Sequence, residues 1–178
     1  MEIPGLGPVL EDNQVEGSYR FGPVAVPVLD GTLCSFIIDG FDGDKRQEDF
    51  VDAIRSFLTI DRSVLTDALP SLFAYYRDVV DEAAAQGWDI DVRIESPHDI
   101  LDHVELGDEP VVSRDPHGDR HVYVSLGCEC AWEPEHGLQI VFRDGRTVTK
   151  VGPYDGHLTN AAAFADPTLE GVVYHQVK

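Results

Sequence analysis

Two segments of alternating apolar residues, joined by an Asp-Gly pair, constrain the fold of this chain more than any other feature. Leu138, Ile140 and Phe142 recur at every second position, and Asp144-Gly145 then precedes Thr147–Val151. Apolar residues at every second position are typical of a strand with one buried face, and Asp-Gly favours a tight hairpin turn. The sequence therefore predicts a β-hairpin in this part of the chain.

The first forty residues carry a second hairpin signal. Val24, Val26 and Val28 alternate with other residues, and Asp30-Gly31 then precedes the apolar segment Thr32–Ile38. Alternation followed by an Asp-Gly pair is again typical of two strands joined by a tight turn. Strands are therefore expected toward both ends of the chain.

Helical patterns occupy the middle of the chain. Phe50, Ile54 and Phe57 fall at i, i+4 and i+7, which is the spacing of one face of an amphipathic helix. A second apolar stripe runs over residues 72–83. Pro70 lies in front of that stripe and is expected to kink or restart the helix, because proline lacks the N–H that an interior turn needs.

Strands, then helices, then strands predict an α+β fold, with a mainly antiparallel sheet and two to three helices packed on one face. The length suits a single domain over residues 1–178. We expect one hydrophobic core between the helices and the sheet. Its expected members are Phe50, Ile54, Phe57, Leu72, Phe73, Tyr76, Val80, Val122, Val124, Leu138, Ile140 and Phe142.

The charge balance is strongly acidic, since 33 Asp and Glu face 13 Lys and Arg and the formal net charge is −20. Such a chain repels nucleic acid, whose phosphates bind Lys and Arg, and attracts basic proteins. The segment Asp78–Glu109 contains eleven acidic residues and one basic residue, Arg93. This segment is either a solvated face or the contact surface for a basic partner. The residues expected to meet that partner are Asp78, Asp81, Glu82, Asp89 and Asp91.

The sequence gives no indication of a membrane protein or a secreted one. No segment approaches the ~20 apolar residues that span a bilayer. Met1-Glu2 opens the chain without the basic and apolar regions of a signal peptide. The three cysteines are too few, and odd in number, for a secreted disulfide scaffold. We therefore expect a cytoplasmic protein, and the sequence leaves its oligomeric state open.

Cys128, Cys130 and His136 form the densest group of reactive residue types. Thiolates and imidazole suit zinc, but the spacing is C-x-C and the chain has no second cysteine pair. Residues at i and i+2 of a strand share a face, so both thiols can lie in the core as small apolar groups. We expect reduced, buried thiols and neither a metal nor a cofactor.

Two catalytic interpretations of the same stretch stay open as alternatives. A cysteine nucleophile would have Glu129 and Glu133 as neighbours, and these carboxylates would raise the pKa of a thiol rather than lower it. Glu133 and Glu135 could instead act as an acid–base pair. The chain lacks the nucleophile elbow, the zinc-protease motif, the P-loop and the glycine fingerprint of dinucleotide binding.

Two polar segments flank the predicted hairpin, one before its first strand and one after its second. The strands of a hairpin are antiparallel, so its two open ends lie side by side and the flanking segments should converge. The convergence can serve packing and turn formation alone, or it can line a small pocket. The expected residues of a ligand site there are Trp132, Glu135, His136, Tyr154, Asp155 and His157.

Four blocks of the sequence resemble a family of uncharacterised, small, acidic, stand-alone bacterial proteins. The blocks are Ile3–Val9, Glu48–Phe57, Trp132–Gly145, which contains W-x-x-E-H-G-L, and Lys150–Asn160, which reads KVGPYDGHLTN. The W-x-x-E-H-G-L element is similar to elements of other small bacterial domains, some of them found near polymorphic toxin systems. The resemblance implies an immunity-like role by analogy, and it implies no catalytic residues.

Three classes of function remain open on these grounds. A binding protein that neutralises a basic partner fits the small size, the acidity and the lack of catalytic motifs. A small-molecule or metal-binding domain would use the two polar segments beside the hairpin. An enzyme of unrecognised mechanism is the third alternative.

Overall fold

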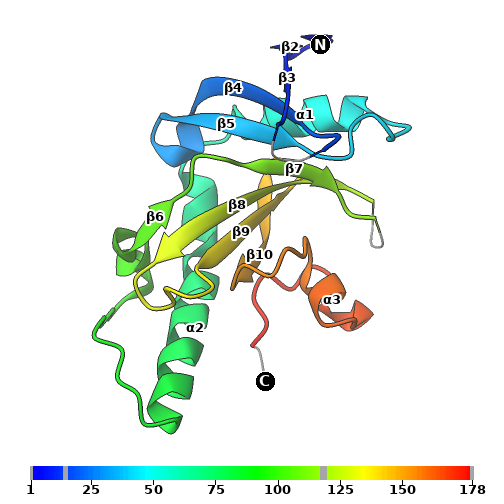
Figure 1. Cartoon of the computed structure of the whole chain (residues 1–178). Coiled ribbons are helices and arrows are strands. Elements are labelled where there is room, and N and C mark those ends of the chain that lie inside the picture. Colours follow the sequence, from blue (N-terminus) through cyan, green and yellow to red (C-terminus); the bar gives the residue numbers. More distant parts are fainter. Residues whose placement is uncertain (1, 14–15, 117–119, 177–178) are drawn as a thin grey trace.

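The computed structural model describes residues 2–13, 16–116 and 120–176, and one large sheet forms its centre (Figure 1). Two short strands, β1 (Glu2–Ile3) and β2 (Gly7–Pro8), make a separate antiparallel pair. The strands of the large sheet are β3 (Leu10–Glu11), β4 (Tyr19–Val26), β5 (Thr32–Ile38), β6 (Val104–Leu106), β7 (Val111–Arg114), β8 (Val122–Cys130), β9 (Leu138–Arg143) and β10 (Thr147–Gly152).

The large sheet has the order β10-β9-β8-β7-β5-β4-β3, and β6 also pairs with β8. Every pair of neighbours is antiparallel except β5 and β7, which run parallel. The helices are α1 (Glu48–Phe57), α2 (Ser63–Ala85) and α3 (Asn160–Ala163), with 3₁₀ turns η1 (Pro27–Leu29), η2 (Pro97–His103) and η3 (Pro167–Leu169). The predicted α+β class with a mainly antiparallel sheet is therefore confirmed.

Both predicted hairpins are present, but the first along the chain has a longer connection than the tight turn expected, because β4 ends at Val26 and Val28 lies in η1. The Asp-Gly pairs of both connections adopt a left-handed backbone. Asp144 and Gly145 have φ of 50° and 63°, and Asp30 and Gly31 have φ of 54° and 80°. These left-handed conformations are the ones that asparagine, aspartate and glycine tolerate best. At Gly145 a side chain would also collide with α1, since a Cβ there would lie 2.0 Å from the carbonyl oxygen of Ala53. The turn between β9 and β10 is therefore seated directly on α1.

Pro70 does not restart a helix, because α2 runs without interruption over Ser63–Ala85 and contains it. Of the two expected outcomes at this proline, a restart is therefore wrong. The first half of α2 buries Leu65, Leu69 and Leu72. Tertiary packing of an apolar face provides most of the stability of helices in proteins, and here it offsets the missing hydrogen bond of the proline.

A single core joins the two long helices to the sheet, as the periodicity predicts. The rings of Phe57 and Phe142 meet edge to face with centroids 5.0 Å apart, which connects α1 to β9. Ten of the twelve expected core residues are buried, whereas Phe73 and Val80 are only partly buried at its edge. The ten are Phe50, Ile54, Phe57, Leu72, Tyr76, Val122, Val124, Leu138, Ile140 and Phe142.

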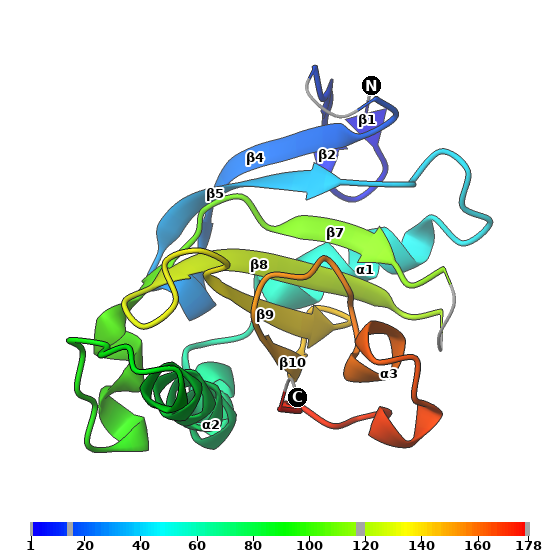
Figure 2. The same cartoon turned by 60° about the horizontal axis from the view of Figure 1, so that its bottom comes forward.

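The opposite face of β8 and β9 is buried as well, which simple alternation does not indicate. Tyr123, Ser125, Gln139 and Val141 alternate with the core residues and are nearly inaccessible. The segment that follows β10 covers this face and crosses in front of β8 and β9 in Figure 2. The amide of Val151 donates a hydrogen bond of 2.7 Å to the carbonyl of Val173, which holds the segment to β10.

Across residues 2–13, 16–116 and 120–176, no helix combines the length and the apolar character needed to cross a membrane.

Candidate functional site

The two polar segments beside the hairpin do converge. The amide of Tyr154 donates a hydrogen bond of 3.2 Å to the carbonyl oxygen of His136. The aromatic ring of Tyr154 lies over Gly127 of β8, where a Cβ would be 3.2 Å from the ring. The loop after β10 is therefore attached both to the loop before β9 and to the outer face of β8.

Trp132 lies apart from the other five expected ligand residues. Its side chain is 1% exposed and packs edge to face against Tyr75 and Tyr76 of α2, with centroids 6.1 and 5.8 Å away. It thus belongs to the core between α2 and the sheet, on the other side of β8 from Tyr154. Trp132 anchors packing, and the structure does not bring it to the surface that the loops form.

The loop before β9 is organised by Glu133. One carboxylate oxygen of Glu133 accepts hydrogen bonds from the amides of Glu135 and His136, at 3.1 and 3.3 Å. The side chains of Glu135 and His136 are exposed. This arrangement is a turn in which the acidic side chain replaces a backbone acceptor, and it occupies the carboxylate that an acid–base pair would need.

The loop after β10 is organised by Asp155 in the same way. A carboxylate oxygen of Asp155 accepts from the amide of His157 at 2.8 Å and from the ammonium of Lys150 at 2.7 Å. Tyr154 and His157 are about half exposed, at 48% for the residue and 49% for the side chain. The structure therefore places Tyr154, Asp155, His157, Glu135 and His136 on two adjoining loops.

A buried polar chain extends inward from Asp155. The ammonium of Lys150 also donates to the side-chain oxygen of Gln139 at 2.8 Å, and the Gln139 amide donates to the hydroxyl of Ser125 at 2.8 Å. Burial lowers the pKa of Lys150, and the ion pair with Asp155 opposes that effect. Lys150 is 1% exposed, so its role is to join β10 to the loop that covers the sheet.

The cysteines lie in the core. Cys128 and Cys130 are 7% and 6% exposed, and both belong to the same apolar cluster, as their i, i+2 spacing predicts. Burial raises the pKa of Cys128 to about 12 and that of Cys130 to about 11, which disfavours the thiolate that a nucleophile or a metal ligand must provide. Among the residues that the structure describes, no three His, Cys, Asp or Glu side chains gather to hold a metal ion.

The expected partner-binding residues lie around the free end of α2. Within α2, which is described throughout, no side chain after Tyr76 is fully buried, and in Figure 1 this half of the helix projects beyond the sheet. The helix ends at Ala85, Gly87 takes φ of 83°, and the amide of Trp88 donates to the carbonyl of Ala83 at 2.9 Å. We define the acidic tip as Asp81, Glu82, Trp88, Asp89 and Asp91, all of which are exposed.

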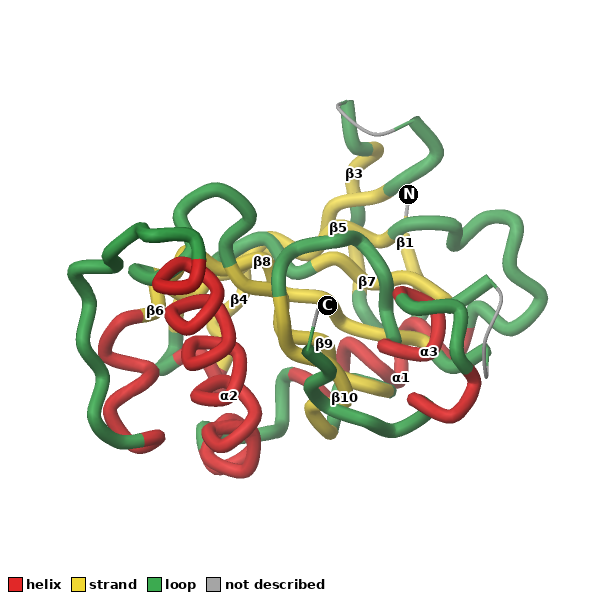
Figure 3. Tube along the Cα trace, turned by 90° about the horizontal axis from the view of Figure 1, so that it is seen from below, coloured by secondary structure: helices red, strands yellow, loops and turns green. Residues whose placement is uncertain are grey.

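The segment after Trp88 returns along α2, as Figures 1 and 3 show. The hydroxyl of Tyr76 donates to the carbonyl of Val92 at 3.2 Å and accepts from the amide of Ile94 at 3.0 Å. A single buried tyrosine therefore fixes the return segment to the helix. Asp89 and Asp91 are consequently held beside the end of α2 that carries Asp81 and Glu82.

Asp78 differs from the other four acidic residues. Its carboxylate accepts a hydrogen bond of 2.7 Å from the hydroxyl of Tyr174, and Asp78 is half-buried. It ties the C-terminal segment to α2 and lies outside the acidic tip.

Sequence reasoning also overlooked Trp88, although a tryptophan directly after a helix-ending glycine and directly before an acidic run is a signal that could have identified it.

Comparisons with known proteins show the family of the chain and nothing about its chemistry. A family model described as a domain of unknown function, DUF6985, matches residues 6–158, which include the sheet, α1, α2 and the acidic tip. Neither the comparison with curated proteins nor the comparison with solved structures gave a match. Since the matched residues make up most of the chain, this protein belongs to the DUF6985 family.

Proposed function

We propose that this protein binds a basic protein partner in the cytoplasm through its acidic tip and neutralises that partner, which is an immunity-like role. The observation that carries the proposal is the exposure of Trp88, which is 73% accessible between acidic residues. Tryptophan is among the residues most enriched in the energetic centres of protein interfaces. A large aromatic side chain exposed on a rigid projection is typical of an interaction site.

The charges around Trp88 support a partner of positive charge. Asp81, Asp89 and Asp91 form no ion pair with any residue in the described part of the chain. The negative end of the α2 dipole adds to their potential. Carboxylates that are not neutralised internally attract a cationic surface and speed the encounter with it.

The proposal assigns different kinetic roles to the charges and to the aromatic ring. Exposed charges at an interface steer diffusion, so they act mainly on the association rate, whereas a buried aromatic anchor acts mainly on dissociation. Reversing Asp81, Glu82, Asp89 and Asp91 to Lys should lower the association rate at least about tenfold at low salt. Trp88→Ala should instead raise the dissociation rate, at an expected cost of about 2 kcal/mol in binding.

The experiment begins with a pull-down from the native host, after which association is measured by surface plasmon resonance across a salt series. The matched control reverses four exposed acidic residues elsewhere, namely Glu2, Glu11, Glu16 and Asp67, and so changes the net charge equally. If the control and the tip variant bind at the same rate, net charge alone explains association. If association does not depend on salt between about 0.05 and 0.5 M, steering by these carboxylates is ruled out.

A further inference from the structure

A polar cavity lies at the turn end of the β9–β10 hairpin, opposite the end that carries the two converging loops. It has a volume of about 440 Å³ and lies between α1, the segment before α1, the start of β8 and the β9–β10 turn. A cavity of this size accommodates a small metabolite. Its charged lining consists of three arginines and three aspartates, Arg46, Arg120, Arg146, Asp49, Asp52 and Asp144, and His121 lies beside them. Three of the ten arginines of a chain with net charge −20 therefore line one cavity.

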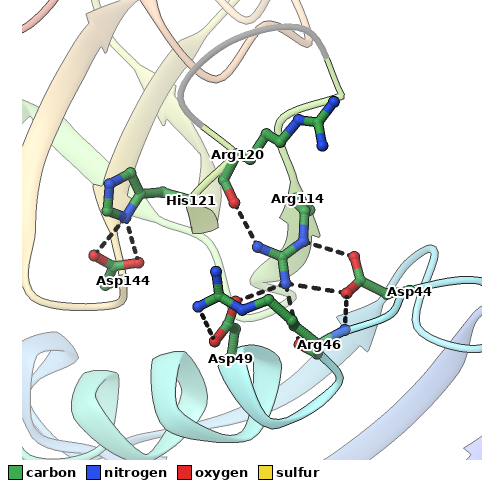
Figure 4. A network of polar contacts seen from close by, with 7 residues as sticks. All are labelled: Asp44, Arg46, Asp49, Arg114, Arg120, His121 and Asp144. Atoms are coloured by element: carbon green, nitrogen blue, oxygen red, sulfur yellow. Dashed lines mark hydrogen bonds and ion pairs between the residues drawn. The ribbon is translucent and has the colours of Figure 1, made fainter.

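Arg114 fixes the backbone on two sides of this cavity (Figure 4). Its guanidinium donates to the carbonyl oxygens of both Arg46, at 3.1 Å, and Arg120. The same guanidinium is paired with Asp44 and Asp49 at 2.6 and 2.8 Å and is largely buried. The positions from which Arg46 and Arg120 project are thus held by one rigid, fully engaged group.

The third wall is also fixed in place. Asp144 holds the ring of His121, whose Nδ1 lies 3.0 and 2.9 Å from the two carboxylate oxygens. The amide of Arg146 donates to the carbonyl of Arg143 at 3.0 Å, within the turn that Gly145 seats against α1. Arg146 is therefore presented from a turn with a defined position. Preorganised walls of this kind lower the conformational entropy that the protein loses when a ligand binds.

Some of the charged side chains that line the cavity form no ion pair within the described part of the protein. Arg46 is paired with Asp49 at 2.9 Å, whereas the guanidinium groups of Arg146 and Arg120 have no ion-pair partner among residues 2–13, 16–116 and 120–176. In Figure 4 the Arg120 side chain extends away from the rest of the network, so it contributes charge at the rim. Asp52, on α1, is exposed and also has no ion-pair partner in the described chain.

We propose that this cavity binds a small polar molecule that carries an oxyanion group, either phosphate or carboxylate, together with hydroxyl groups. The planar guanidinium matches both oxyanions through paired hydrogen bonds, and Arg46 and Arg146 provide it here. The Asp52 carboxylate is an acceptor for hydroxyl groups of the same ligand. The negative charge of the rest of the protein is screened beyond about 8 Å at physiological salt. Of the three carboxylates in the lining, Asp49 and Asp144 are engaged by Arg46 and His121, which leaves Arg120 and Arg146 as the unpaired cations that an oxyanion meets.

The experiment is a titration followed by amide NMR, with inorganic phosphate, ribose 5-phosphate, citrate and uncharged ribose as separate probes. We expect ribose 5-phosphate or citrate to shift the amide signals of Ala53, His121 and Arg146, and ribose to shift none. If only the phosphate-containing probes shift these signals, the oxyanion that the cavity binds is phosphate. If only citrate shifts them, it is carboxylate. Asp52→Ala should strengthen the binding of inorganic phosphate, because it removes a carboxylate from the cavity, and should strengthen ribose 5-phosphate less, because the acceptor for its hydroxyl groups is lost.

The double variant R46Q/R146Q should weaken the binding of the active probe at least about tenfold. The matched control is R77Q/R93Q, which removes the same charge from two exposed arginines outside the cavity. Thermal unfolding of each variant verifies that the fold is kept. Equal affinity of the two double variants overturns the proposal, and so does the absence of shifts at about 10 mM of every probe.

Discussion

The ammonium of Lys150 lies 2.7 Å from a carboxylate oxygen of Asp155, and the two side chains differ sharply in exposure, at 2% and 32%. The pair is therefore asymmetric. If Lys150 were removed, the Asp155 side chain would turn to solvent. If Asp155 were removed, Lys150 would stay enclosed beneath the loop, with only Gln139 to accept a hydrogen bond from its ammonium. An unpaired buried charge is far more costly than an unpaired exposed one.

The first prediction follows from this asymmetry. Asp155→Ala should lower the free energy of unfolding by about 3 kcal/mol, because it leaves a buried ammonium uncompensated. Lys150→Met should cost only about 1 kcal/mol, because it removes the charge and keeps an apolar stem of similar length. Urea denaturation of the two variants and the wild type measures the difference. Equal losses would mean that the loop opens readily and hydrates Lys150.

The second prediction concerns the turn between β9 and β10. Gly145→Ala should destabilise the protein by about 3 kcal/mol, since it adds a collision with α1 to the strain of a left-handed residue. Gly31→Ala is the matched control, because Gly31 is also left-handed but a Cβ there meets nothing within 4 Å. It should cost about 1 kcal/mol. Thermal unfolding compares the two, and a similar loss for both would show that α1 and the turn separate easily.

The third prediction concerns the thiols. At pH 8 the native protein should react with a thiol reagent far more slowly than the urea-unfolded protein, in which three thiols react, because Cys34, Cys128 and Cys130 are all buried. Their folded pKa values of about 11, 12 and 11 lie above the unfolded value of 9.0. Their contribution to stability is thus complete below about pH 9 and is lost as the pH rises through 11–12.

Alkaline unfolding tests the second half of that prediction. The free energy of unfolding should fall above about pH 9, and a Cys34→Ala, Cys128→Ala, Cys130→Ala variant should show a shallower fall between pH 9 and 10. Identical slopes for the wild type and the triple variant would contradict the burial of the thiols. Rapid modification of one thiol in the native protein would do so as well.

The fourth prediction concerns the acid limb of stability. The hydrogen bond from Arg114 is the main reason that the pKa of Asp44 lies below 3.8. A lowered carboxyl pKa stabilises the fold above its unfolded value, and this contribution disappears as the pH falls through the folded value. Asp44→Asn should therefore cost about 2 kcal/mol at pH 7 and progressively less below about pH 4. If the difference in the free energy of unfolding between the wild type and Asp44→Asn stays constant down to about pH 2, the charge of Asp44 does not contribute to stability.

Features that depend on neighbours in sequence could be predicted here. The turn at Asp144-Gly145, the core face of β9 and the helical face of α1 each follow from a local pattern whose physical cause is also local. The capped start of η2 is another such case, since the hydroxyl of Ser96 accepts from the amide of His98 at 3.2 Å. These elements position the loops that converge at Tyr154 and His136.

Features that depend on distant parts of the chain could not be predicted. The burial of Gln139 and Ser125 requires the segment after β10, whose irregular path has no periodic signal. The arginine-lined cavity combines Arg46, His121 and Arg146, which come from three separate places in the sequence. The position of Trp88, after a helix-ending glycine and before an acidic run, was a usable signal, but the extent of its exposure becomes known only with the path of the surrounding chain.

The parallel pairing of β5 and β7 has a consequence for how the sheet assembles. It is a short ladder, with Ile37 opposite Val111 and Ile38 opposite Val112, and it connects two antiparallel halves. Each half forms from hairpins between neighbours in sequence, whereas the ladder closes a loop that contains both long helices. Long-range closure loses more chain entropy and is slower. The middle of the sheet, rather than either hairpin, should therefore set the rate of folding.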